Sequence, residues 1–216
     1  MAQPICEFAK KLAFRYTRLG APEYPYIIEP VQLATLVNEM DRVREIEGAI
    51  IEVGVARGMT TRFICEHLVA SRLDNERVYA IDTFDSFRPK DVDFEVNHRG
   101  KKPQEVSGFG YINFDSWKRN FREFKFLTAF KADCSTFDYK AIAPIKLAFL
   151  DVDLYLPTRA ALARIYEYMS EGGALLIDDV MQPCRWDGAY QAYKGFCEER
   201  GLPFRLIGNK MGIIRK

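Results

Sequence analysis

Five short apolar segments, each ending at or beside an acidic residue, limit how this 216-residue chain can fold more than any other feature of its sequence. Stretches with helical periodicity lie between them, at 59–73, 114–125 and 157–170. Nearly continuous apolar strands that alternate with helices are typical of a parallel sheet covered on both faces. We therefore predict an α/β fold, a single Rossmann-like domain with a mostly parallel central sheet. Its strands are expected at 49–53, 77–81, 126–131, 145–150 and 173–177.

The two flanks of this pattern add further elements. A helix should begin at Pro30, because proline is favoured in the first helical turn. The segment 204–214 contains the turn sequence Gly208-Asn209 and predicts an antiparallel hairpin at the edge of the sheet. The apolar face of the helix that begins at Pro30 should consist of Val31, Ala34, Val37 and Met40.

We divide the chain into an N-terminal helical extension or lid over residues 1–26 and one domain over residues 27–216. Apolar residues recur at helical spacing between Ile5 and Tyr16, with lysines and arginines on the rest of the turn. Such a helix would suit a lid or a homodimer contact. The segment 85–112 is polar, contains glycine and has no clear period, so a mobile lid insertion is expected there.

Composition excludes several classes of protein. Hydrophobic residues make up 48% of the chain and charged residues 28%, as in ordinary globular proteins. The net charge of +1 gives no bulk field for nucleic acid, so no such partner is expected. Five widely spaced cysteines form no zinc or disulfide pattern, and no segment approaches the ~20 apolar residues of a membrane span. We expect a cytoplasmic protein that is not an integral membrane protein.

The first predicted strand leads into a glycine-containing turn, Glu52-x-Gly54-x-x-x-Gly58. Gly54 permits a tight turn and a close backbone approach, and Gly58 lets the next helix start close to a ligand. Asp82 ends the following strand, at the position where an acid binds the hydroxyl groups of a nucleoside ribose. The two features together indicate a nucleoside-containing cofactor.

The choice of cofactor follows from charge. A dinucleotide needs a G-x-G-x-x-G cradle for its pyrophosphate, and here Ala56 and Arg57 stand inside the turn. Glu52 would repel phosphate but suits the ammonium group of S-adenosylmethionine. One alternative is an NAD(P)-dependent short-chain-type oxidoreductase, because Tyr190 and Lys194 have the spacing of its catalytic pair. Another is a non-catalytic protein that binds a nucleoside cofactor.

Four aspartates follow two strands that a parallel sheet can bring together. Asp151 and Asp153 end one strand, and Asp178 and Asp179 end the next. Neighbouring strands lie ~4.8 Å apart, and two carboxylates ~4 Å apart repel by about 4 kcal/mol, or about three pKa units. Such a cluster must hold protons, pair with Lys or Arg, or bind a cation. We expect a hard cation such as Mg²⁺, unless Asp153 and Asp179 merely cap the following helix and turn.

The chain resembles the macrocin O-methyltransferase-like (TylF-like) family over roughly residues 27–215. The resemblance rests on EVGVARG (52–58), YAIDTFDSF (79–87), ADCSTF (132–137), LAFLDVDLYLPT (147–158) and GGALLIDDV (172–180). It implies a class I, S-adenosylmethionine-dependent methyltransferase that acts on a hydroxyl group, usually of a sugar in a natural product.

The resemblance also implies roles for individual residues. Asp153 would be the general base, and Asp151, Asp178 and Asp179 would bind Mg²⁺. His98, in the predicted lid, is a second candidate base, and the basic residues beside it could meet an acidic substrate. The cofactor site would be lined by Glu52, Gly54, Gly58, Met59, Thr60, Asp82, Asp133, Ser135 and Asp151.

Overall fold

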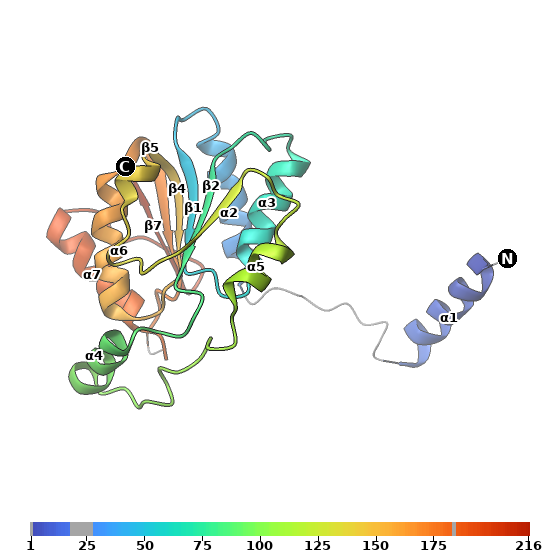
Figure 1. The fold of residues 1–216 in the computed structure, drawn as a ribbon, viewed down its shortest axis with the longest axis horizontal. Helices are drawn as coiled ribbons and strands as arrows, with labels where there is room; N and C mark the ends of the chain where they lie inside the picture. Colours follow the sequence, from blue (N-terminus) through green and yellow to red (C-terminus); the bar gives the residue numbers. More distant parts are fainter. Residues whose placement is uncertain (1, 18–27, 183–184) are drawn as a thin grey trace.

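A seven-stranded sheet forms the centre of the computed structural model, which describes residues 2–17, 28–182 and 185–216 (Figure 1). The order of the strands is β3-β2-β1-β4-β5-β7-β6. β1 to β5 pair in parallel, whereas β7 pairs antiparallel with both β5 and β6. The strands are β1 (Ala49–Val53), β2 (Val78–Asp82), β3 (Leu127–Lys131), β4 (Ile145–Leu150), β5 (Met169–Ile177), β6 (Leu206–Ile207) and β7 (Met211–Arg215). The predicted parallel sheet and edge hairpin are confirmed.

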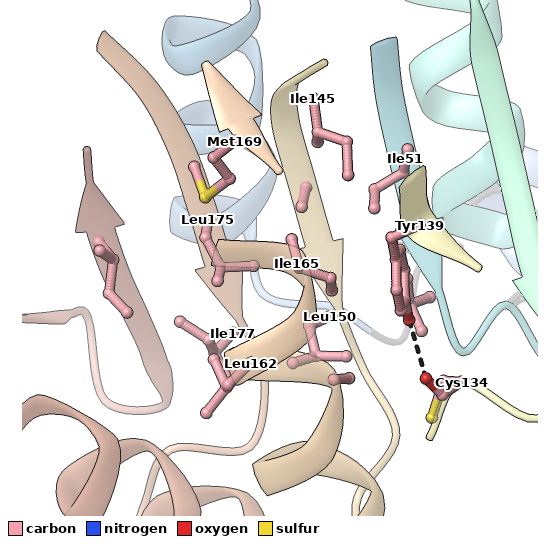
Figure 2. Close-up of a cluster of buried hydrophobic side chains, with 14 of the residues drawn as sticks. Ile51, Cys134, Tyr139, Ile145, Leu150, Leu162, Ile165, Met169, Leu175 and Ile177 are labelled. Carbon is pink, nitrogen blue, oxygen red and sulfur yellow. Dashed lines mark hydrogen bonds between the residues drawn. The ribbon is translucent and has the colours of Figure 1, made fainter. Parts of the chain in front are cut away.

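Helices cover both faces of this sheet. The helices of the described residues are α1 (Ala2–Tyr16), which lies apart from the sheet, α2 (Pro30–Arg42), α3 (Met59–Ala70), α4 (Pro89–Arg99), α5 (Phe114–Asn120), the short 3-10 helix η2 (Tyr139–Ile142), α6 (Tyr155–Glu167) and α7 (Gly188–Arg200). α6 and α7 pack on the face that includes Ile51 and Leu150, and Figure 2 shows part of this cluster. α2 and α3 pack on the opposite face, against Ile50 and Leu147. Successive strand residues thus bury their side chains in two separate cores.

Several helices differ from the sequence prediction, and α3 (predicted 59–73) and α6 (predicted 157–170) both end three residues early. α5 ends at Asn120, five residues before the predicted end. α4 is an eleven-residue helix inside the segment 85–112, which had no recognisable period. α2 begins at Pro30 as predicted, but Val31 and Ala34 are exposed. That helix instead buries Leu33, Leu36 and Met40 together with Gln32 and Glu39. Gln32 donates to buried Asp178, and Glu39 pairs with the partly exposed Arg42 and Arg215.

α1 lies apart from the sheet and its covering helices (Figure 1). Its apolar side chains from Phe8 onward are largely exposed, and Phe14 and Tyr16 are 74% and 76% exposed. The extension predicted for residues 1–26 therefore contains a helix, although residues 18–27 lie outside the described part of the chain. Within the described residues, no helix has both the length and the apolar character that crossing a bilayer requires.

Candidate active site

A cavity of about 350 Å³ opens beyond the carboxyl ends of the parallel strands. Ligands of α/β proteins bind at this edge, where the strand order changes direction. Residues from the turns after β1, β2, β3, β4 and β5 line it, together with residues from α4 and from the β6–β7 hairpin. Among its lining residues are the predicted site residues Glu52, Gly54, Met59, Thr60, Asp82, Asp133, Asp151, Asp153, Asp178 and Asp179.

The turn after β1 requires its two glycines. Gly54 has φ 82°, and a Cβ atom built on it would lie 1.9 Å from the carbonyl oxygen of Asp151. Gly58 has φ 88°, and its Cβ would lie 2.5 Å from the ring of Phe121. The close approach predicted for Gly54 is therefore observed, but against the neighbouring strand end. Gly58 begins α3 and packs behind the cavity, since it is not among the lining residues.

Two acids line the cavity near the carboxyl ends of β1 and β2. Glu52 is buried at the end of β1, where the Thr61 hydroxyl donates a hydrogen bond to it. Burial raises the pKa of Glu52 to about 8, so this carboxyl is mostly protonated at neutral pH. Asp82 accepts hydrogen bonds from the backbone N–H groups of Val55 (2.7 Å) and Phe84 (2.6 Å). Asp82 thus fastens the turns after β1 and β2 to each other.

The aspartates after β4 and β5 form the predicted cluster. Carboxylate oxygens of Asp151, Asp153 and Asp179 lie within 4.8 Å of one another. Asp153 (φ 61°) and Asp179 (φ 57°) both have left-handed backbone, so each strand has already turned where its second aspartate enters the cavity. Burial, with the charges of neighbouring aspartates, raises the pKa of Asp151 and of Asp153 well above the usual range. A bound cation would stabilise the ionised form of these two carboxyl groups.

Asp178 faces a different set of partners. Its Oδ1 accepts hydrogen bonds from the Gln32 side chain (2.7 Å) and from the backbone N–H of Asp179 (2.7 Å). The Lys210 ammonium lies 3.2 Å from that same oxygen and 3.0 Å from Asp179 Oδ1. These two carboxylates raise the pKa of Lys210, although burial acts in the opposite direction. The structure therefore groups Asp153, rather than Asp178, with Asp151 and Asp179.

Helix capping does not account for Asp153. α6 begins at Tyr155 with Leu154 at its N-cap, and no side chain caps it from that position. The backbone N–H of Tyr155 donates instead to Glu95 of α4, at 2.7 Å. Asp153 thus faces the cavity without the capping role considered from the sequence.

The other predicted residues separate into two groups. Asp133 is at the cavity, where Lys90 (3.3 Å) and Arg88 (3.7 Å) approach its Oδ2 atom. These attractions and a hydrogen bond from the Ser135 backbone outweigh burial and lower the pKa of Asp133. Ser135 and His98 are not among the lining residues, and the His98 ring packs on Phe94, with centroids 4.9 Å apart. Their proposed roles stay predictions that the geometry does not favour.

The basic residues beside His98 serve a structural purpose. Arg99 is nearly buried and donates to Glu95 (2.6 Å) and to Asp187 (2.7 Å), which precedes α7. Lys101 also lies 2.7 Å from Asp187. The ion pairs with Asp187 attach α4 and the residues after it to the start of α7, and the Tyr155 hydrogen bond to Glu95 attaches α4 to the start of α6, next to Asp153.

Sequence reasoning missed several residues of the cavity. Lys210 is the clearest case, because it follows Asp179 by 31 positions and no local signal connects them. Asp91 and Trp186 were missed because each lies outside the strand ends and the glycine turn from which the site was predicted. Other lining residues without a predicted role are Arg57, Asp85, Phe87, Arg88, Phe109 and Tyr111.

The dehydrogenase pair does not reach the cavity. Tyr190 packs its ring against Phe204, with centroids 5.7 Å apart, and Lys194 lies 3.9 Å from Glu198 on the same helix. Neither residue is among those that line the cavity. The oxidoreductase alternative therefore has no support from the position of these residues.

Comparison with solved structures defines the class of fold. The calicheamicin methyltransferase CalS11 superposes with a TM-score of 0.69 and 18% identity, covering 99% of this chain and 92% of that one. The O-methyltransferase NovP superposes with a TM-score of 0.71 and 18% identity, covering 96% of this chain and 88% of that one. The fold is that of the class I methyltransferases.

Sequence comparison then gives the family. Residues 26–209 match the family model described as macrocin O-methyltransferase (TylF), and the chain belongs to this family. A curated relative is 27% identical over 158 residues, which are 69% of this chain. It is the 8-demethyl-8-(2,3-dimethoxy-alpha-L-rhamnosyl)-tetracenomycin-C 4'-O-methyltransferase of Streptomyces olivaceus, and the match covers 59% of that relative's length.

Proposed function

We propose that this protein transfers a methyl group from S-adenosylmethionine to a hydroxyl oxygen of a glycosylated natural product, assisted by a divalent cation. Family membership and the name of the curated relative support the reaction class and a sugar-bearing acceptor. The observation that carries the proposal is the single cavity shared by Glu52, Asp82 and the aspartates after β4 and β5. That cavity is suited to a cationic guest beside a cluster of carboxylates.

Residues at the carboxyl ends of β1 and β2 would form the part of the cavity that binds the cofactor. Glu52 would bind the ammonium group of the methionine moiety, which favours the ionised carboxylate and offsets its burial. Gly54 lets the turn after β1 pack against the backbone of Asp151 at the edge of the cavity. Asp82 would accept from the ribose hydroxyl groups while it keeps the β1 turn in place.

The acidic cluster fits a hard divalent cation. Carboxylate oxygens are the ligands that Mg²⁺ prefers, and the raised pKa values of Asp151 and Asp153 show how poorly these charges are compensated by protein groups. We assign the ligand role to Asp151, Asp178 and Asp179, as the family resemblance implies. When bound, the ion would lower the pKa of a coordinated hydroxyl group.

Asp153 is assigned the role of general base. It lies in the cavity next to the ligands, where its carboxylate could take a proton from the acceptor hydroxyl. The oxygen then attacks the methyl carbon, the carbon–sulfur bond breaks, and its electron pair stays on sulfur as the neutral thioether. Positioning the two reactants in line supplies a large part of the rate.

Aromatic side chains supply an apolar wall for the acceptor. Phe87 packs against Phe109 and Trp186, in both cases with centroids 5.5 Å apart, and all three line the cavity with Tyr111. Flat apolar faces of this kind suit a glycoside ring attached to an aglycone. The family and the fold do not favour the oxidoreductase or the non-catalytic alternative.

Chelation and substitution of Asp153 test the proposal together. Excess EDTA should abolish methyl transfer, and added Mg²⁺ should restore it. Asp153→Asn should lower kcat about 10²- to 10⁴-fold while Mn²⁺ affinity, measured by titration calorimetry, is unchanged. The matched control is Asp115→Asn, which changes an exposed aspartate of α5.

Two results would contradict parts of this proposal. Full turnover in excess EDTA would reject the role of the cation. Loss of Mn²⁺ binding in Asp153→Asn, with binding retained in Asp178→Asn, would make Asp153 a ligand rather than the base.

A further inference from the structure

Asp91, on the first turn of α4, is a buried carboxyl group that lines the cavity. Its residue is only 2% exposed, and its Oδ1 atom has no hydrogen-bond partner within the described part of the chain. Leaving a buried polar atom without a partner costs about 1–3 kcal/mol, and more for a charged group. An oxygen in this position is therefore suited to accept a hydrogen bond from a guest in the cavity.

The position of Asp91 identifies which part of the guest it would meet. Burial raises its pKa, and the neighbouring charges that also act on it belong to Lys90, Asp133, Arg88 and Glu95. Arg88 and Lys90, close to Asp91 in the chain, both approach Asp133, which follows β3. In the strand order β3-β2-β1-β4-β5, β2 and β1 separate that strand end from the four aspartates after β4 and β5. Asp91 therefore belongs to the Asp133 end of the cavity, away from the proposed site of methyl transfer.

The other acids near this end already have donors. Asp133 Oδ1 accepts from the Ser135 backbone at 2.9 Å, and its Oδ2 faces Lys90 and Arg88. Asp82 accepts from backbone N–H groups with both of its oxygens. Among these acids, Asp91 Oδ1 is the oxygen left for a donor on the guest, and the flanking ion pairs from Lys90 and Arg88 to Asp133 hold it there.

We propose that Asp91 recognises the nucleobase of the cofactor by accepting a hydrogen bond from the exocyclic amine of adenine. This inference rests on the proposed use of S-adenosylmethionine. The adenine amine is the donor farthest from the sulfonium along that molecule, which agrees with a position of Asp91 near the end of β3 rather than near the ends of β4 and β5. A 6-oxo base such as hypoxanthine presents an acceptor at the same position, so the site would discriminate against it.

The test compares the binding of S-adenosylhomocysteine and S-inosylhomocysteine by titration calorimetry. The wild-type protein should prefer the adenosyl compound by about 10- to 100-fold, the value of a hydrogen bond to a charged group. Asp91→Ala should lose this preference through weaker binding of the adenosyl compound. Asp91→Asn should bind the two compounds about equally, because its amide can accept from the amine or donate to the oxo group.

Asp93→Asn, an exposed change on the same helix, is the matched control and should keep the wild-type preference. Thermal unfolding of the near-isosteric Asp91→Asn checks that the fold is retained. Equal affinities in the wild-type protein, or an unchanged preference in Asp91→Ala, would overturn the role of Asp91 alone. Failure of the wild-type protein to bind S-adenosylhomocysteine would overturn the proposed function as well.

Discussion

At the scale of single residues, buried charge dominates the behaviour of this protein. Glu52, Asp151, Asp153 and Asp178 all have raised pKa values because burial removes water from their carboxyl groups. Lys210 is the cation that the structure places against two of the aspartates. A cationic guest in the cavity would favour the ionised form of these carboxyl groups.

Glu52 predicts a pH-dependent affinity for the cofactor. Its folded pKa is about 8 against an ordinary 4.5, so the free protein retains a proton that must leave before the carboxylate can pair with an ammonium group. The Kd for S-adenosylhomocysteine should therefore fall by up to about tenfold per pH unit as the pH rises toward 8. Glu52→Gln should bind more weakly and show no such slope. A constant wild-type Kd between pH 6 and pH 8 would refute this account.

Glu52 makes the stability of the fold depend on pH in the opposite direction to the cofactor affinity. An acid whose folded pKa is raised contributes stability below its unfolded pKa, and this contribution is lost as the pH rises through the window from 4.5 to about 8. Binding of an ammonium-bearing ligand at high pH should offset that loss.

Lys210 predicts a link between stability and the cation. Lys210→Met removes the ammonium group from Asp178 and Asp179, and the variant should lose about 3 kcal/mol of unfolding free energy in EDTA. Because Mn²⁺ can replace the missing charge, it should stabilise Lys210→Met more than the wild-type protein in urea unfolding. Lys194→Met, at an exposed position on α7, is the control. Equal stabilisation of variant and wild type by Mn²⁺ would contradict this prediction.

At the scale of elements, the site depends on how closely strand ends and helix starts approach each other. The Gly54 turn packs on the backbone of Asp151, and Gly188 at the start of α7 packs on the backbone around Tyr155. α4 is joined to α6 by the Glu95 contact with Tyr155 and to α7 by the pair of Arg99 with Asp187. Three helices and two strand ends thus fix the position of Asp153.

Gly54→Ala tests this close packing. The new Cβ would lie 1.9 Å from a backbone oxygen, at a φ that alanine rarely adopts, so β1 and β4 must separate at their ends. The variant should lose about 3 kcal/mol or more of unfolding free energy, together with binding of S-adenosylhomocysteine. Gly195→Ala, in the middle of α7 with open space around it, should be neutral or stabilising by about 0.5–1 kcal/mol. Wild-type stability and binding in Gly54→Ala would show that the close contact is not required.

At the scale of the whole molecule, the sheet and its two helical layers form a unit from which α1 stands apart (Figure 1). The homodimer considered from the sequence stays a prediction, and so does the cytoplasmic location. The same holds for the division at residue 26, but the separation of α1 makes it directly testable.

Deletion of residues 1–26 should leave the domain folded. Because the described side chains of α1 from Cys6 onward are mostly exposed, their loss should change the unfolding free energy by no more than about 0.5 kcal/mol. Urea unfolding of the shortened and full chains measures this difference, and sedimentation of both shows whether the extension affects assembly. A large loss of stability would mean that the extension belongs to the folded domain.

The parallel sheet, the edge hairpin and the gathering of Glu52, Asp82 and the four aspartates at one edge could all be predicted from the amino-acid sequence. Strand identity follows from runs of apolar residues, and parallel strands must place their carboxyl ends together. These inferences need only local patterns and one rule of topology.

Only the tertiary structure decided which charges compensate one another. Lys210 reaches Asp178 and Asp179, Gln32 is buried because it donates to Asp178, and Asp91 enters the cavity on a helix that lacks an apolar period. Hydrogen bonds and ion pairs act over about 3 Å in space, whatever the separation along the chain. Sequence periodicity shows which faces of an element are apolar. It gives no information about polar partners that lie far apart in the sequence.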